Sequence, residues 1–200
     1  MQTRPYPDQD GLRIWLSEDE QNHLLNHYDE AEYPRRRLAL ELGLCGLRSD
    51  EIRNVEYQHF RQIGEDVWKL RIPSGKTGTR EVPVTDELHQ RVKYLKGASQ
   101  LRQDQHLIDV STRSLRDWIQ KARKEIAEDL DDDRWLQLGM HDLRRTWATD
   151  TYYTLAFDGV PIAEQLTMGW GGWKMTESGR STFRENYLGP EPDYIAIHAF

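Results

Sequence analysis

The other motifs of this chain can be arranged around one stretch, Gly139-Met140-His141-Asp142-Leu143-Arg144-Arg145-Thr146-Trp147-Ala148-Thr149. His141 and Arg144 are three residues apart, so on a helix they share one face and can point at one ligand. Arg offers a planar fork of donors that matches phosphate oxygens, and His offers a donor that can also carry a proton. The pair suits an anionic ligand, although alone it is more simply explained as a helix-start histidine and a solvated arginine.

A chain of 200 residues can form one domain with a real core. Its seven Trp and nine Tyr favour a folded protein over a disordered one. The single Cys excludes an internal disulfide and a Cys-based zinc site, and the seven His lack the spacing of metal ligands. No apolar run approaches the length of a membrane span and no signal peptide is apparent, so we expect a cytoplasmic protein without a membrane partner.

The charged residues of the chain support two opposite expectations about a nucleic-acid partner. The net charge of −7 argues against nucleic acid as a partner. However, the basic residues are 20 Arg against 7 Lys, and acidic residues are concentrated in residues 18–20, 29–32 and 125–133. This distribution permits an acidic outer surface and a separate face lined by Arg, although a generic acidic domain fits equally well. An acidic, Lys-poor surface also resembles proteins of halophilic archaea and of their viruses and plasmids.

The hydrophobic periodicity predicts a mainly α fold with a small antiparallel β-sheet. Residues 1–16 contain two prolines and are predicted to be an irregular lead-in. Strand-like alternation at 67–72 and 80–84, on either side of a turn cluster, predicts a hairpin. Capping residues and helical spacing predict helices over 17–27, 34–45, 49–55, 85–95, 111–130 (or from 114), 142–155, 161–169 and 182–187, with loops at 131–133 and 171–181.

Four further motifs accompany the His-x-x-Arg stretch. Two precede it, Leu42-Gly43-Leu44-Cys45-Gly46-Leu47-Arg48-Ser49-Asp50-Glu51-Ile52 and Gly75-Lys76-Thr77-Gly78-Thr79-Arg80-Glu81-Val82-Pro83-Val84, and two follow it, Gly171-Gly172-Trp173 and Glu185-Asn186-Tyr187-Leu188. In this order the five motifs resemble the catalytic domain of the tyrosine recombinases, the phage integrase family. The first is similar to the family's Thr-Gly-Leu-Arg-x-x-Glu-Ile and the second to its Lys-Thr-Gly-x-x-Arg-x-Val-Pro. The resemblance covers roughly residues 16–190 and implies the fold of that domain.

The chain departs from the family pattern in several places. Cys45 replaces the usual Thr, and Tyr187 follows Trp173 by fourteen residues, a longer gap than is usual in the family. Trp170 competes with Trp173 for the tryptophan position of the Gly171-Gly172-Trp173 motif, which we call the third box, and we favour Trp173 because of its Gly-Gly-Trp context. Family members usually carry a helical core-binding domain before the catalytic one. We expect none here, and divide the chain into a lead-in segment at 1–16, a catalytic domain at 17–188 and a C-terminal tail at 189–200.

The resemblance implies a nucleophile and a phosphate clamp. Tyr187 would attack the phosphorus of a DNA strand and remain joined to its 3′ phosphate, and the ester keeps the bond energy, so no metal, ATP or other cofactor is expected. Arg48 and Arg144 would hold the two non-bridging oxygens, where negative charge develops. The rival tyrosines, none of which follows the third box as naturally, are Tyr152, Tyr153 and Tyr194.

Four other residues take supporting roles under the same resemblance. His141 would hydrogen-bond the phosphate and assist proton transfer. Lys76, on the hairpin tip, would protonate the departing 5′ oxygen, which an Arg cannot do. Trp173 would pack the site and donate through its indole N–H, and Glu51 would orient the site. Ordinary alternatives remain for several of these residues. Arg48 and Glu51 could form a helix ion pair, Lys76 could be a solvated turn residue, Trp173 could be a core or surface aromatic, and Tyr187 could be a core tyrosine.

The resemblance also implies double-stranded DNA as the partner, with self-association on that DNA. The arginines that we expect to contact DNA are Arg35, Arg36, Arg37, Arg80 and Arg145, of which the first three could equally face solvent. Two functions remain open. One is a site-specific recombinase that cleaves and rejoins strands through a 3′-phosphotyrosine, and the other is a recombinase-derived DNA-binding or regulatory module. We favour the enzyme, because a pure binder has no need of Lys76 or Tyr187.

Overall fold

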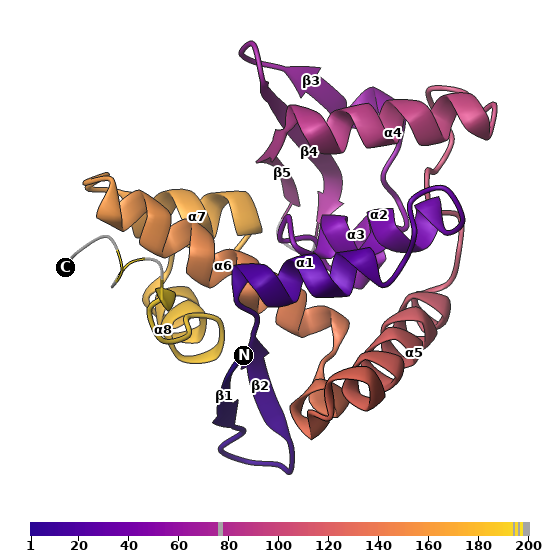
Figure 1. Cartoon of the computed structure of the whole chain (residues 1–200). Helices are drawn as coiled ribbons and strands as arrows, with labels where there is room; N and C mark the ends of the chain where they lie inside the picture. Colours follow the sequence, from indigo (N-terminus) through magenta and orange to yellow (C-terminus); the bar gives the residue numbers. More distant parts are fainter. Residues whose placement is uncertain (76–77, 194, 196, 198–200) are drawn as a thin grey trace.

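Helix α6 (Met140–Phe157) runs through the middle of the fold and contacts elements from both ends of the chain (Figure 1). The computed structural model describes residues 1–75, 78–193, 195 and 197. The other helices are α1 (Glu18–Asn26), α2 (Pro34–Gly43), α3 (Ser49–Ile52), α4 (Asp86–Ala98), α5 (Thr112–Leu130), α7 (Ala163–Gly171) and α8 (Glu177–Asn186), with 3-10 turns η1 (Tyr57–His59) and η2 (Asp133–Gln137). This arrangement confirms the predicted fold class, a mainly α protein with small antiparallel sheets.

The strands form two separate antiparallel sheets. One sheet has the order β3-β4-β5, and the other is a hairpin of β1 with β2. Their bounds are β1 (Gln2–Pro5), β2 (Leu12–Trp15), β3 (Phe60–Gln62), β4 (Val67–Gly75) and β5 (Gly78–Thr85). The predicted hairpin at 67–84 is thus confirmed as β4 and β5, with Leu70 opposite Val82. Strand β3 was not predicted, because a three-residue strand is too short to show an alternating pattern.

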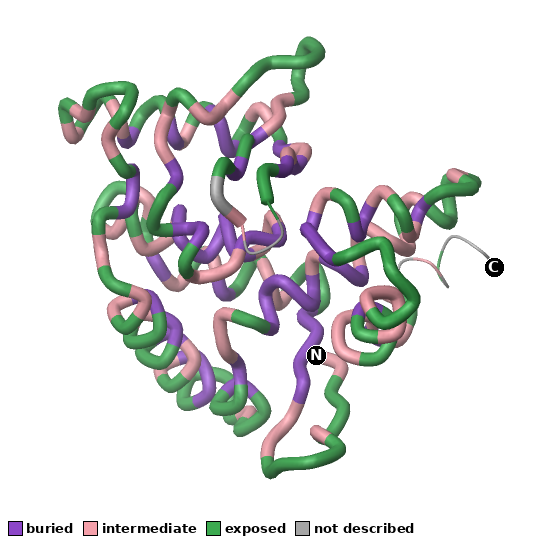
Figure 2. Tube along the Cα trace, turned by 180° about the vertical axis from the view of Figure 1, so that it is seen from behind, coloured by how far each residue is buried: buried purple, intermediate pink, exposed green. Residues whose placement is uncertain are grey.

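Helix α2 is buried because other elements cover it on opposite sides. Leu38 and Leu42 join the core cluster that contains the sheet residue Leu70 and helix α4. Leu40 joins a second cluster, with residues from α1, β2, α5 and α6. Gly43 lets α2 approach α6 closely, because a Cβ at that position would stand 2.9 Å from Cδ1 of Leu143. The purple segments at the centre of Figure 2 follow these buried elements.

The prediction of an irregular lead-in at residues 1–16 is wrong, because this segment forms the β1–β2 hairpin. Gln2 pairs with Trp15 and Pro5 with Leu12, and the second strand is buried at Ile14 and Trp15. The two prolines lie in the outer strand and the turn rather than in the buried strand, where they would remove ladder hydrogen bonds. In Figure 1 the hairpin lies beside α8, so the N-terminal segment of the chain is next to its last helix.

Two predicted loops also differ from the structure. Helix α8 begins at Glu177 rather than at 182, because Thr176 caps it by accepting a hydrogen bond from the main-chain nitrogen of Gly179 at 3.2 Å. Residues 131–133 are not simply a solvated loop, since Asp131 ends α5 in the left-handed conformation and η2 begins at Asp133. No helix within the described part of the chain is both long enough and apolar enough to cross a membrane.

Candidate active site

Two arginines from distant segments converge on the C-terminal end of α7, at Gly171 and Gly172. Arg144 of α6 is fully buried, and its Nη2 donates to the carbonyl oxygen of Gly171 at 2.7 Å. Its Nη1 donates to the carbonyl oxygen of Gly46. Arg48 lies at the N-terminus of α3 and remains partly exposed, and its Nη2 donates to the carbonyl oxygen of Gly172 at 3.3 Å. The two guanidinium groups therefore reach adjacent carbonyls at the end of α7.

The site around Arg144 is short of negative charge. Burial and then the positive charge of Arg48 lower the pKa of Arg144 to about 9. Among the described residues, Nε of Arg144 is buried and has no hydrogen-bond partner. A buried cation with an open donor is costly unless an anion approaches it. This geometry can therefore bind an anion.

Glu51 holds Arg48 in place through a buried ion-pair network. Its carboxylate accepts two bonds from Arg80, at 2.5 and 2.8 Å, one from Nη1 of Arg48 at 3.0 Å, and one from the main-chain nitrogen of Arg48 at 2.8 Å. Burial by itself would raise the pKa of Glu51, but the hydrogen bonds and charges of Arg80 and Arg48 outweigh it and hold the pKa below its ordinary value. Glu51 is thus a charged acceptor that orients two arginines.

His141 lies at the N-terminus of α6 with its ring against that of Tyr187. The two ring centroids are 5.1 Å apart in an edge-on arrangement. His141 retains an exposed surface, and a cavity of about 430 Å³ opens beside it, lined also by Arg116 and Arg123. Desolvation, followed by the positive charges of Arg145, Arg144 and Arg48, lowers the pKa of His141 to about 4. The ring is therefore neutral at neutral pH and can accept a proton.

Tyr187 follows the last residue of α8 and contacts three of the predicted site residues. Its ring stands edge-on to Trp173, with centroids 4.6 Å apart, as well as to His141. The guanidinium carbon of Arg144 lies 4.0 Å from the ring centroid of Trp173 and 5.6 Å from that of Tyr187. The rival Tyr152 and Tyr153 lie farther along α6, where they pack edge-on against each other.

The structure separates the two tryptophans that compete for the third box. Trp173 packs between Arg144, Tyr187 and Phe183 and is only 8% exposed. Gly171 is required for this packing, because a Cβ there would come within 1.9 Å of the Trp173 ring. Trp170 instead packs against the main core, and its carbonyl oxygen accepts from Nε of Arg80 at 2.8 Å. Trp173 is therefore the one that contacts the arginine and tyrosine of the site.

Two of the arginines predicted to contact DNA are buried inside the protein. The guanidinium of Arg80 is bound by Glu51 and by the carbonyl of Trp170, and Arg80 is 8% exposed. Arg145 is 5% exposed, pairs with Asp142, and donates to the carbonyl oxygen of Asn186 at 3.0 Å. Because each of these guanidinium groups already pairs with a carboxylate, Arg80 with Glu51 and Arg145 with Asp142, we do not expect either side chain to contact DNA directly.

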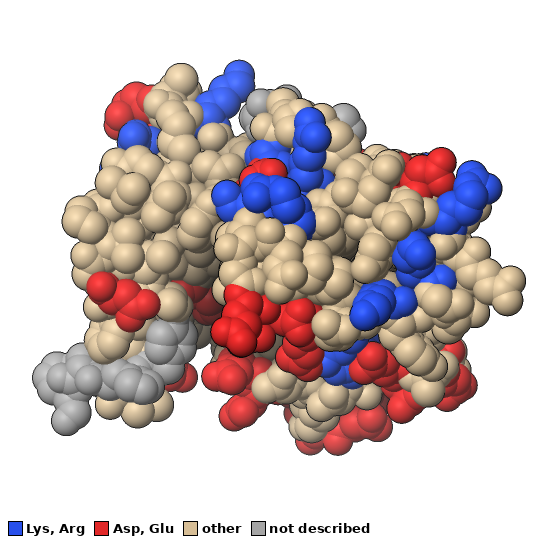
Figure 3. Space-filling view, turned by 90° about the horizontal axis from the view of Figure 1, so that it is seen from above, with Lys and Arg blue, Asp and Glu red and all other residues tan. Residues whose placement is uncertain are grey.

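The other three arginines predicted to contact DNA differ in their exposure and in their partners. Arg35 is exposed. Arg36 lies over the ring of Tyr33, with the guanidinium carbon 4.7 Å from its centroid, and Arg37 pairs with Glu41 at 3.3 Å. Lys76 and Tyr194 lie outside the described residues. In Figure 3 most acidic side chains lie along the lower edge of the face shown, and Lys and Arg side chains lie mainly above them, an arrangement that the sequence permits.

Sequence reasoning missed residues that support the site from the N-terminal hairpin. Nε1 of Trp15 donates to the carbonyl oxygen of Tyr187 at 2.9 Å, and Arg13 bonds to the two residues before Tyr187. The alternation Leu12-Arg13-Ile14-Trp15 was a signal for a strand. Nothing local indicates where that strand docks. Among the described residues there is no group of three or more His, Cys, Asp or Glu that could hold a metal ion.

Comparisons with known proteins agree on one family. The model of the phage integrase family matches residues 14–177. The chain is similar to the XerH site-specific recombinase bound to palindromic difH substrate in a post-cleavage complex, with 15% identity, a TM-score of 0.66, and coverage of 96% of this chain and 53% of that one. It is also similar to the XerA recombinase, with 20% identity, a TM-score of 0.61, and coverage of 93% and 63%.

A third similar structure is the Tn1549 transposon integrase in complex with transposon right end DNA. It has 13% identity and a TM-score of 0.64, and the match covers 97% of this chain and 67% of that one. No curated protein sequence matches the chain significantly. The chain thus shares the fold of these proteins and spans about half to two thirds of their length.

Proposed function

The chain belongs to the phage integrase family, and from this premise we propose that it is a site-specific recombinase that cleaves and rejoins DNA through a 3′-phosphotyrosine. The observation that carries the proposal is the convergence of Arg144, His141 and Trp173 around the side chain of Tyr187, with Arg48 bonded to the carbonyl oxygen of Gly172, next to Trp173. These residues come from four separate segments. A structural core has no need to gather two buried or half-buried cations beside a tyrosine.

The phosphate would occupy the place where negative charge is missing. A phosphodiester brings one negative charge, and its transition state develops more on the two non-bridging oxygens. Arg48 is already oriented by Glu51, and Arg144 is fixed by two carbonyls, so neither has to reorganise when the charge develops. The open Nε of Arg144 is a donor for one of those oxygens. Such fixed donors stabilise a transition state more than flexible ones do.

The strand-cleavage step is a transfer of one phosphoryl group. The phenol oxygen of Tyr187 bonds to phosphorus, and the bond from phosphorus to the 5′ oxygen breaks. The 5′ oxygen stays attached to the released end of the cleaved strand. The phenol proton passes to a base, and neutral His141 is the ring next to Tyr187. We assign the proton for the departing 5′ oxygen to Lys76, which lies outside the described residues. Rejoining reverses the same steps.

Double-stranded DNA is the partner that this chemistry requires, and we propose that copies of the chain associate on it. The XerH and Tn1549 structures that the chain resembles are complexes with DNA. Among the predicted contacts, exposed Arg35 is the one that remains available for phosphates, and we add Arg116 and Arg123 in the cavity beside His141. We propose the segment 17–188 as the catalytic domain, with the β1–β2 hairpin as a part of it.

Covalent trapping tests the proposal. A pool of nicked duplexes with randomised sequence is incubated with the protein, and complexes that survive detergent are recovered and sequenced. We expect the native protein to be trapped, Tyr187→Phe to bind DNA without being trapped, and the matched control Tyr153→Phe to be trapped normally. Trapping by Tyr187→Phe would move the nucleophile to another residue. Binding without any trapping of the native protein would favour the alternative, a DNA-binding or regulatory module.

A further inference from the structure

The end of helix α8 is capped by side chains from the N-terminal hairpin. The last carbonyl groups of a helix have no partner within the helix. Here Nη1 of Arg13 donates to the carbonyl oxygen of Glu185 at 2.6 Å, and its Nη2 donates to Oδ1 of Asn186 at 2.8 Å. Nε1 of Trp15 donates to the carbonyl oxygen of Tyr187 at 2.9 Å. One strand, β2, therefore bonds to three consecutive residues that end at the proposed nucleophile.

Helix α6 completes this cap from the other side. Arg145 donates to the carbonyl oxygen of Asn186 at 3.0 Å. The hydroxyl of Thr149 donates to the carbonyl oxygen of Tyr187 at 3.0 Å and accepts from the main-chain nitrogen of Gly189 at 2.9 Å. Gly189 lies directly on the hairpin, because a Cβ there would come within 2.8 Å of the Trp15 ring. The chain on both sides of Tyr187 is thus held by β2 and α6 together.

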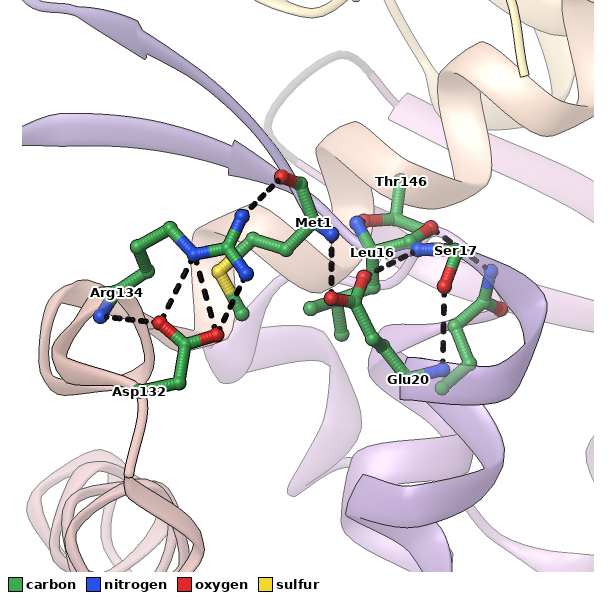
Figure 4. Close-up of polar contacts among 8 residues, drawn as sticks. Met1, Leu16, Ser17, Glu20, Asp132, Arg134 and Thr146 are labelled. Carbon is green, nitrogen blue, oxygen red and sulfur yellow. Dashed lines mark hydrogen bonds and ion pairs between the residues drawn. The ribbon is translucent and has the colours of Figure 1, made fainter. Parts of the chain in front are cut away.

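The hairpin itself is fixed to the helix that carries His141 and Arg144. The main-chain nitrogen of Ile14 donates to Oδ1 of Asp142 at 3.2 Å, and that of Leu16 donates to the hydroxyl of Thr146 at 3.0 Å. Figure 4 shows the second of these contacts beside Met1, whose main-chain nitrogen pairs with Glu20. The position of Tyr187 relative to α6 is therefore fixed in two ways, by direct hydrogen bonds to α6 and by bonds to the hairpin, which is itself bonded to α6.

The charge of Arg13 suits a role as a helix cap. Arg13 is 7% exposed, and its hydrogen-bond partners in the described structure are uncharged oxygens, the carbonyl oxygen of Glu185 and Oδ1 of Asn186. Its counter-charge is the partial negative charge at the C-terminus of α8, where cations are stabilising. The ring of Tyr6 covers the guanidinium, with its centroid 5.3 Å away. Arg13 bonds to one main-chain oxygen and one side-chain oxygen at the end of α8, and this buried cation loses both bonds if the helix end moves. The position of Arg13 and that of the helix end therefore depend on each other.

We propose that Arg13 and Trp15 are positioning residues that hold Tyr187 for attack, a role that rests on the proposed function and gives the N-terminal hairpin a part in catalysis. The hairpin closes the C-terminal end of α8 and sets the direction in which the backbone of Tyr187 leaves the helix. Without this cap, the last turn of α8 frays and the phenol samples orientations away from Arg48 and Arg144.

The test compares Arg13→Ala with a control arginine of no structural role. Arg102→Ala removes an exposed side chain that pairs only with Asp104 within the described structure, and it makes the same change in charge. Hydrogen exchange is measured on the protein alone for the amides of residues 184–189. Because the end of α8 loses a buried hydrogen-bond donor, we expect exchange there to become about 10-fold faster in Arg13→Ala only.

Activity is measured next, as the rate of covalent trapping at saturating DNA together with the dissociation constant. We expect Arg13→Ala to lower the rate about 10-fold or more, as for other small misplacements of a reacting group, with the dissociation constant within about two-fold. Arg13→Lys keeps the charge and should recover part of the rate. Trp15→Phe removes the indole donor while keeping an aromatic ring at this buried position, so it decides the question if Arg13→Ala does not fold.

The outcomes are distinct. Unchanged exchange at 184–189 overturns the cap, and faster exchange with an unchanged trapping rate overturns the positioning role. A weaker dissociation constant with an unchanged rate would make Arg13 a DNA contact instead. If the native protein is never trapped, the proposed function fails and the positioning role falls with it, while the exchange measurement still decides whether the hairpin caps α8.

Discussion

Replacing Glu51 by Gln removes one charge from the centre of the site and leaves its volume nearly unchanged. The Glu51 carboxylate is bonded to both arginines of the network, with Arg80 at 2.5 and 2.8 Å and Arg48 at 3.0 Å. An amide keeps one oxygen acceptor but turns an N–H donor toward the remaining N–H groups. Arg80, which is 8% exposed, therefore remains a buried cation but loses its bond to one of the two carboxylate oxygens of Glu51.

The expected loss of stability is large. Breaking a buried ion pair by changing one partner costs about 3–5 kcal/mol, and we take about 3 kcal/mol because Gln retains one acceptor. For a domain of this size, about 2–4 °C per kcal/mol gives a fall in melting temperature of about 6–12 °C. The pKa of Glu51 is held below the ordinary 4.5, so its stabilisation is present above that pH and is lost as pH falls through the lower folded value. The native and variant melting temperatures should therefore converge below about pH 4.5.

Thermal unfolding followed by circular dichroism between pH 3 and 7 measures this difference. The matched control is Glu81→Gln, which removes a half-exposed carboxylate paired with Arg61 at 3.2 Å and with Lys69 at 3.4 Å. A surface pair of this kind is worth about 0–1 kcal/mol. At a temperature where both proteins are folded, trapping by Glu51→Gln should also fall about 10- to 100-fold, because Arg48 loses its orienting partner. Equal melting temperatures for the two variants at pH 7 would refute the reasoning.

Three further outcomes follow from particular contacts. Arg144→Lys keeps the charge but loses the fork that joins two carbonyls, so trapping should fall at least about 100-fold at saturating DNA, and near-normal trapping would remove Arg144 from the clamp. Trp173→Ala should reduce trapping more than Trp170→Ala, since Trp173 contacts the site, and the reverse ranking would shift the third box by three residues. His89 is buried in a stack on Trp68 with a pKa lowered by burial from 6.5, so stability is lost as pH falls below that value. Urea midpoints at pH 7 and 5 should therefore fall less in His89→Phe than in the native protein, and an equal fall would contradict this.

The regular elements and the site motifs could be predicted because they depend on local spacing. The helical period and a capping serine at 111 or 114 predicted α5, which is capped by Ser111, and alternation predicted β4 and β5. The His141–Arg144 spacing indicated a shared helix face, and the order of the five motifs indicated the family. Backbone geometry sets which residues share a face, so a short stretch of sequence carries this information.

The partners of buried charged groups were decided by the tertiary structure alone. Arg80 and Arg145 look like candidate DNA contacts in the sequence, yet each is bonded inside the protein, to Glu51 and to Asn186. Arg13 reaches Glu185 across 172 residues, and no spacing rule connects the two. A guanidinium taken out of water must find acceptors, and which acceptors are near is set by how distant elements pack. Local sequence therefore predicted which residues could do the chemistry, and packing decided which arginines are left to bind a phosphate.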